Sequence, residues 1–119
     1  MGQGGRGGWI ANFVARHGGF RITAVADYFE AVAQAAGERR QVPRERRFSG
    51  LDGYKRLLDS KVDAVFLETP PYFFPAHARA AVAAGCHVYM AKPVAVDVPG
   101  CLEILETGRQ AARTKRCSW

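Results

Sequence analysis

Glycines near the start of the chain are spaced as they are in a phosphate-binding turn. Gly2, Gly4 and Gly7 fit the pattern G-x-G-x-x-G. Glycines at this spacing permit a tight turn, close approach of the backbone to a pyrophosphate, and tight packing of a helix on a strand. We therefore expect a glycine loop, made of Gly2, Gly4, Gly5, Arg6 and Gly7, to hold the pyrophosphate of a dinucleotide. A merely structural turn is the alternative, because the chain has 13 glycines.

An acidic residue follows this loop where a ribose-binding carboxylate would stand. Asp27 lies twenty residues beyond Gly7, at the end of the apolar run 22–26. A carboxylate there accepts hydrogen bonds from the adenosine ribose and repels a 2′-phosphate, so the sequence favours NAD over NADP. NADP is the second choice, because Arg6 could reach the 2′ position instead of lying at the phosphates or on the surface. The alternative role for Asp27 is to cap the next helix.

The elements that would position these residues alternate along the chain. The patterns predict helices over 8–17, 29–36, 51–58, 75–84 and 99–112, and strands over 22–26, 47–48, 64–68 and 87–90. Gly18, Gly37 and Gly85 are predicted helix ends, and Asp97 is a predicted helix cap. This order predicts an α/β fold, a Rossmann-like doubly wound parallel sheet over residues 1–112, followed by a ragged tail over 113–119.

Further candidate residues follow the later strands. Thr69 and Pro70 come directly after the strand 64–68, and Tyr72 lies in the same loop. Ligands of open α/β sheets bind outside the carboxyl ends of the strands, so these three residues should line a cofactor cleft near the nicotinamide. For Tyr72, as for Phe73 and Phe74, a place in the core or on a partner-facing apolar surface is the equal alternative.

Together with the run AVAAGCHVYMAKPVAVDV, these features resemble the glucose-fructose oxidoreductase, inositol dehydrogenase and rhizopine-catabolism (Gfo/Idh/MocA) family over residues 1–112. That family has a Thr-Pro after the fourth strand, a helix ending in Ala-Gly, then His-Val and Glu-Lys-Pro. The resemblance implies that Lys92 projects toward the substrate beside the nicotinamide and assists proton transfer. Pro93 would shape the turn that aims it. An exposed lysine after a strand is the alternative.

Two positions depart from the family pattern. Ala91 stands where the family usually has glutamate, and the loop 71–75 is longer and more aromatic than the usual Thr-Pro-x-x-x-His. We therefore predict that His77 is a helix-surface histidine. The resemblance implies hydride transfer between a nicotinamide and a sugar, polyol or related hydroxyl substrate. A non-catalytic nucleotide-binding module or an inactive gene fragment is the alternative, which Ala91 and the missing substrate domain favour.

Compared with the family pattern, the chain is short at both ends. Met1 directly precedes Gly2, which leaves no room for the strand that normally launches such a loop. The chain also stops where the family continues into an α/β substrate domain. We expect a fragment, a frameshift product or a truncated product with little turnover alone. Substrate binding and the interface of a homo-oligomer are expected only with the missing domain.

Composition narrows the remaining function classes. The net charge is +6, but the basic runs at 39–47 and 109–116 do not interleave with aromatics. Solvated charge is therefore predicted rather than nucleic-acid binding, which stays the minor alternative. No apolar stretch approaches the roughly 18 residues of a membrane span, and we expect a cytoplasmic protein. The scattered cysteines and histidines predict buried or unpaired thiols and no metal site; they are Cys86, Cys101 and Cys117 with His17, His77 and His87.

Overall fold

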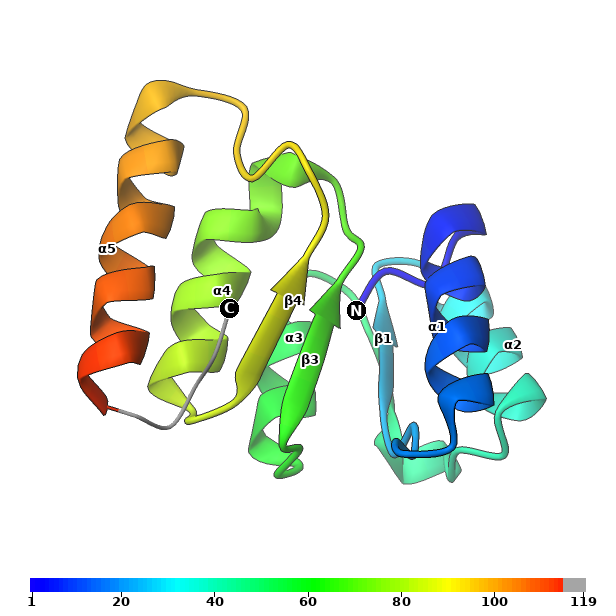
Figure 1. Cartoon of the computed structure of the whole chain (residues 1–119). Helices are drawn as coiled ribbons and strands as arrows, with labels where there is room; N and C mark the ends of the chain where they lie inside the picture. The colour runs from blue at the N-terminus through cyan, green and yellow to red at the C-terminus, as the bar shows by residue number, and fades with distance from the viewer. Residues whose placement is uncertain (115–119) are drawn as a thin grey trace. The chain divides into compact units, whose positions relative to one another are not determined.

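The computed structural model describes residues 1–114, in two compact units that divide between Val62 and Asp63. Each unit contains one pair of parallel strands with helices packed on it (Figure 1). The structure therefore confirms the predicted α/β class with parallel strands. None of the helices described over residues 1–114 combines the length and the hydropathy that a membrane span requires.

The first unit is built on the strands β1 and β2. Its elements are α1 (Gly5–His17), β1 (Val25–Asp27), α2 (Glu30–Arg39), the 3-10 turn η1 (Arg44–Arg46), β2 (Arg47–Ser49) and α3 (Gly53–Asp59). Val25 pairs with Arg47 and Asp27 with Ser49. Helices α2 and α3 lie on opposite sides of β1 (Figure 1). Their small and branched side chains close the core, which contains Val25, Ala26, Ala33, Ala36, Val42, Leu57 and Leu58.

The second unit is built on β3 and β4. Its elements are β3 (Ala64–Leu67), the 3-10 turn η2 (Pro71–Phe73), α4 (Phe74–Ala83), β4 (His87–Met90) and α5 (Val98–Thr114). Ala64 pairs with His87, and Leu67 pairs with Met90. Helix α4 packs on both strands, and α5 packs on α4 (Figure 1). The buried side chains are apolar, and they include Val65, Leu67, Phe74, Ala78, Ala81, Val82, Cys86 and Val88.

Most predicted helix ends lie where the sequence places them. Gly18 and Gly85 follow α1 and α4 with φ values of 76° and 78°, a left-handed conformation that glycine adopts without steric cost. Asp97 accepts a hydrogen bond from the Gly100 amide at 2.7 Å and so caps α5 as predicted. Helix α5 continues to Thr114, which takes in the first two residues of the predicted tail. Residues 115–119 lie outside the described part.

Several predicted boundaries differ from the structure. Helix α1 begins at Gly5, inside the glycine loop, and β1 covers Val25–Asp27, so it starts three residues later and ends one residue later than the predicted strand 22–26. Gly37 does not end α2, which continues to Arg39. A Cβ atom at Gly37 would overlap the Arg47 side chain, so glycine there serves packing rather than termination.

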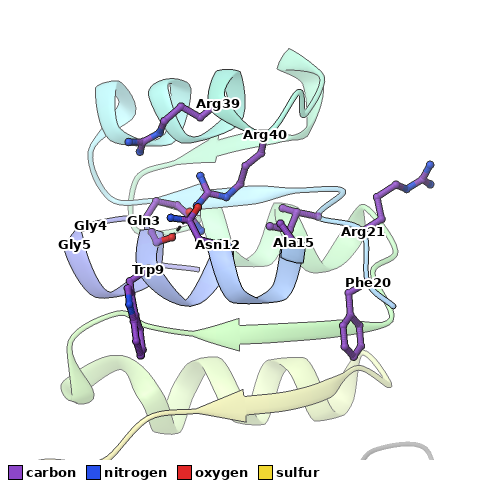
Figure 2. Close-up of a pocket in the computed structure, with 12 residues that line it drawn as sticks. Gln3, Gly4, Gly5, Trp9, Asn12, Ala15, Phe20, Arg21, Arg39 and Arg40 are labelled. Atoms are coloured by element: carbon purple, nitrogen blue, oxygen red, sulfur yellow. Dashed lines mark hydrogen bonds between the residues drawn. The ribbon is translucent and has the colours of Figure 1, made fainter. Parts of the chain in front are cut away.

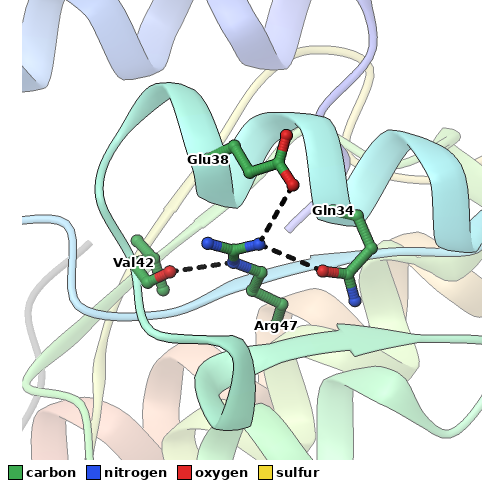
Figure 3. A network of polar contacts seen from close by, with 4 residues as sticks. All are labelled: Gln34, Glu38, Val42 and Arg47. Atoms are coloured by element: carbon green, nitrogen blue, oxygen red, sulfur yellow. Dashed lines mark hydrogen bonds and ion pairs between the residues drawn. The ribbon is translucent and has the colours of Figure 1, made fainter.

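The prediction of solvated charge at 39–47 is wrong for three arginines. Arg40 donates to the Gly8 carbonyl at 2.9 Å, and Arg46 donates to the carbonyls of Thr23 and Ser60. Arg47 donates to the Val42 carbonyl at 2.8 Å and to Gln34 at 3.2 Å (Figure 3). These guanidinium groups hold segments of the first unit together. Absence of a nucleic-acid partner stays a prediction.

The two cysteines within the described residues are thiols. Cys86 is buried and Cys101 is exposed, as the prediction of buried or unpaired thiols allows. Cys117 lies outside the described residues.

Candidate functional site

The glycine loop docks on the end of β1. The Gly2 amide donates to the Ala26 carbonyl at 2.8 Å. Gly2 has a φ of 79°, in the left-handed region that favours glycine. Gly4 is the N-cap of α1, and Gly7 is buried in the first turn of that helix. The loop therefore leads directly into a helix, as a phosphate-binding turn does.

Asp27 joins the loop to the strand. Its Oδ2 accepts a hydrogen bond from the Gln3 amide at 2.7 Å, and its Oδ1 accepts one from the Phe29 amide at 3.0 Å. The structure thus brings Asp27 and the glycine loop together. The alternative role as N-cap is wrong, because Phe29 is the N-cap of α2. The remaining lone pairs of the carboxylate can accept further hydrogen bonds.

The N-terminus of α1 has the features of an anion site. A Cβ atom at Gly4 or Gly5 would meet no atom within 4 Å, so space is open above the first amides. No side chain caps this end, and the first turn carries no acidic residue. The amides at a helix N-terminus and the helix dipole favour an anion there. Arg6 is exposed in the same turn.

A cavity of about 950 Å³ extends from this loop along α1 (Figure 2). Its charged lining residues are Arg21, Arg39 and Arg40, and no Asp or Glu lines it. The cavity is therefore electropositive. Burial of the Arg40 guanidinium, followed by the nearby Arg39 charge, lowers the pKa of Arg40. Its other lining residues are Gln3, Gly4, Gly5, Gly8, Trp9, Asn12, Ala15, Phe20 and Ile22.

Gln3 is a loop residue that the sequence analysis missed. Its side chain is buried, and Oε1 has no hydrogen-bond partner. Buried polar atoms usually have a partner, so an orphaned acceptor beside the loop fits a site for a polar ligand. Gln3 occupies a variable position of the glycine pattern, which is why the pattern gives no signal for it.

The second unit carries the remaining candidates at one edge of its sheet. Thr69 and Lys92 each lie two residues beyond the paired residues Leu67 and Met90, so both follow the carboxyl ends of neighbouring parallel strands. Lys92 is exposed, and its peptide bond to Pro93 is cis. Ala91 is buried, so a methyl group fills the position where the family pattern has a carboxylate.

The aromatic run after Pro70 divides between surface and core. Tyr72 is 70% exposed in η2, whereas Phe74 is 2% exposed in the core. Phe73 is half-buried between them. The alternatives of core and surface therefore hold for different members of the run, with Phe74 in the core and Tyr72 on the surface.

The prediction that His77 lies on the helix surface is wrong. His77 is 7% exposed, on the same face of α4 as Phe74, Ala78 and Ala81. That spacing of i, i+3, i+4 and i+7 is the signal that the sequence analysis did not use. Burial lowers the pKa of His77 to about 4, so the ring is neutral near physiological pH.

A glycine loop that opens a helix and meets an acidic strand end is the arrangement found in Rossmann-type dinucleotide-binding folds. Residues 2–117 match the family described as "Oxidoreductase family, NAD-binding Rossmann fold", GFO_IDH_MocA. The chain belongs to this family.

Known proteins of this type are similar over most of the chain. A "Glycosyl hydrolase family 109 protein" of Streptomyces coelicolor is 31% identical over 118 residues, which are 95% of this chain and 25% of that protein. The WlbA dehydrogenase from Bordetella pertussis, solved in complex with NADH and UDP-GlcNAcA, has a TM-score of 0.82 and 25% identity over 93% of this chain and 32% of that one.

KijD10, a 3-ketoreductase from Actinomadura kijaniata solved with NADP, has a TM-score of 0.60 and 27% identity. The alignment covers 76% of this chain and 28% of KijD10. The chain thus spans between 25% and 32% of the length of these three proteins.

Proposed function

We propose that this chain binds NAD through the glycine loop and Asp27, as the dinucleotide-binding part of an oxidoreductase. The observation that carries the proposal is the position of Asp27, whose carboxylate is hydrogen-bonded to the Gln3 amide at 2.7 Å beside the open N-terminus of α1. An anion site and a ribose acceptor then lie next to each other, which is the arrangement that a dinucleotide requires.

Each candidate residue has a separate role in this proposal. The amides of the loop residues Gly2, Gly4, Gly5 and Gly7 hold the pyrophosphate, with Arg6 close to it. Asp27 holds the adenosine ribose, and NADP is the second choice because this carboxylate repels a 2′-phosphate. Thr69, Pro70 and Tyr72 line the nicotinamide side of the cleft.

Lys92, aimed by Pro93, donates a hydrogen bond to the reacting oxygen of the substrate and assists its proton transfer. The bound dinucleotide supplies the hydride chemistry, and the protein supplies orientation.

The substrate class rests on the relatives. WlbA was solved with a nucleotide sugar, and KijD10 is a 3-ketoreductase. We infer a sugar, polyol or related hydroxyl substrate for the complete protein, with parts beyond this chain forming its pocket. We expect the complete protein to lie in the cytoplasm and to form a homo-oligomer.

A non-catalytic module is the second candidate, because buried Ala91 stands where the family pattern has a carboxylate beside Lys92. Reduction of NAD by the full-length protein with a panel of sugars and polyols would eliminate it.

The first test is a fluorescence titration with NADH and with NADPH. A Trp119→Phe background leaves Trp9, which lines the cavity beside Gly4 and Gly5, as the one tryptophan. We expect saturable binding with NADH favoured. Asp27→Asn should weaken NADH binding about tenfold, because a charged acceptor is lost, and should weaken NADPH binding less, because a repulsive charge is lost too.

Asp59→Asn is the matched control. It makes the same charge change at the exposed last residue of α3 and should leave both affinities unchanged. The ratio of the two affinities separates a ribose contact from general damage to the loop, which would weaken both cofactors equally. A folded wild-type chain that binds neither cofactor contradicts the proposal.

A further inference from the structure

The hydroxyl group of Thr69 faces a buried ring. Its Oγ1 lies 3.3 Å from Nδ1 of His77, which belongs to α4 eight residues further on. The His77 ring stacks on Phe73 with a centroid distance of 5.7 Å and an interplanar angle of 13°. The imidazole is thus in contact both with the end of β3 and with the turn η2.

Few backbone bonds can hold this segment. Pro70 and Pro71 have no N–H groups, so neither can donate a backbone hydrogen bond. The amide of Phe73 does donate to the Pro70 carbonyl at 3.0 Å, which closes the turn. The orientation of the Thr69 side chain therefore depends on side-chain contacts, among them the one to His77.

A hydroxyl group has one hydrogen to donate and two lone pairs to accept with. A neutral imidazole with its hydrogen on Nε2 offers Nδ1 as an acceptor. Thr69 then donates its single hydroxyl hydrogen to Nδ1, and its oxygen lone pairs can accept a hydrogen bond from another group. Burial of His77 favours a neutral ring over a protonated ring with two donors, and we take the tautomer with its hydrogen on Nε2.

We propose that His77 is a positioning residue of the cofactor cleft, which makes the Thr69 hydroxyl an acceptor for an N–H or O–H group of the bound dinucleotide. The inference rests on the proposed function, because Thr69 is a cleft residue there.

The first test compares NADH affinities at about pH 7, where the ring is neutral. Thr69→Val should bind NADH about tenfold more weakly, since the acceptor is lost, whereas Thr69→Ser should bind it as the wild type does. His77→Phe keeps an aromatic ring against Phe73 but removes the acceptor, and it should also cost about tenfold. His77→Asn, which restores an acceptor near the Nδ1 position, should recover most of the affinity.

The double variant decides whether the two residues act together. If His77 acts through Thr69, then Thr69→Val combined with His77→Phe loses no more affinity than either change alone. Losses that multiply to about a hundredfold mean independent roles and overturn the inference. Equal affinities of wild type and Thr69→Val also overturn it.

The imidazole nitrogens provide a readout that needs no cofactor. In ¹⁵N NMR spectra of the wild type we expect the hydrogen on Nε2, with an Nδ1 resonance that moves in Thr69→Val and stays in Thr69→Ser. A hydrogen on Nδ1 overturns the inference, even if NADH binds. These variants leave the buried ring in place, so the test holds if His77→Phe does not fold. A wild type that shows the expected spectra but binds no NADH contradicts the proposed function instead.

Discussion

The glycines of this chain serve different physical purposes. Gly2, Gly18 and Gly85 adopt positive φ values, so the backbone itself requires glycine at these positions. Gly4 has a φ of −63° and ψ of −167°, and a Cβ atom there would meet no atom of the chain within 4 Å. The described residues thus leave open space beside Gly4, and in the proposed function it is the close approach of the pyrophosphate that requires glycine there.

Alanine substitutions should separate these two purposes. Gly4→Ala should lower the free energy of unfolding by at most about 1 kcal/mol but weaken NADH binding at least about tenfold, because the methyl group stands between the amides and the pyrophosphate. Gly18→Ala should cost about 1–2 kcal/mol through left-handed strain and leave NADH affinity unchanged. Urea unfolding and Trp9 fluorescence measure the two effects. Unchanged binding by Gly4→Ala would mean that the pyrophosphate lies elsewhere.

Helix α2 is held in place by one arginine from β2. Arg47 is 9% exposed in its side chain and contacts Gln34, the Val42 carbonyl and Glu38, the last with an N–O distance of 3.7 Å (Figure 3). Gly37 leaves the space that this side chain fills. Helix and strand are therefore fitted to each other at one glycine and one arginine.

This fit reverses the usual effect of replacing glycine in a helix. Helix propensity alone predicts that Gly37→Ala stabilises the chain by about 1 kcal/mol. Because the new methyl group would displace Arg47 from its hydrogen bonds, we expect a loss of about 1–3 kcal/mol in urea unfolding instead. In an Arg47→Ala background the same substitution should be neutral or stabilising. Equal effects in both backgrounds would show that Arg47 and Gly37 are not coupled.

Part of the positive charge of the first unit is used in hydrogen bonds within that unit. Of the arginines at 39–47, three donate to carbonyl groups of the first unit. The net charge of +6 therefore overstates the cations available to an external partner. The cavity along α1 combines three arginine side chains with open space, which suits a small anion better than a duplex surface.

The stability of the chain should depend on pH through His77. Burial lowers its pKa from 6.5 to about 4, so between these values the unfolded chain binds the proton that the folded chain excludes. The contribution of the neutral His77 ring to the free energy of unfolding is complete above pH 6.5 and is lost as the pH falls toward 4. From about pH 7 to about pH 5 the wild type should lose about 2 kcal/mol more than His77→Phe in urea unfolding. If the free energies of unfolding of the wild type and of His77→Phe changed in parallel with pH, a neutral buried ring would be contradicted.

Local patterns were sufficient for the features with local causes. The helix ends at Gly18 and Gly85 and the Asp97 cap depend on residues within a few positions of each other. The strand β4 has the predicted bounds because its apolar run stands between a glycine and a proline. The family follows from the same short patterns in order.

The remaining features depend on contacts between segments that are distant in the sequence. The Asp27 carboxylate bonds to Gln3 rather than capping α2, Gly37 continues its helix because of Arg47, and His77 is buried against Phe73. Hydrophobic pattern and propensity describe a residue with its near neighbours, whereas burial and hydrogen bonding depend on which segments meet. The sequence therefore predicted which residues could form a dinucleotide site, and the folded structure showed which contacts those residues make.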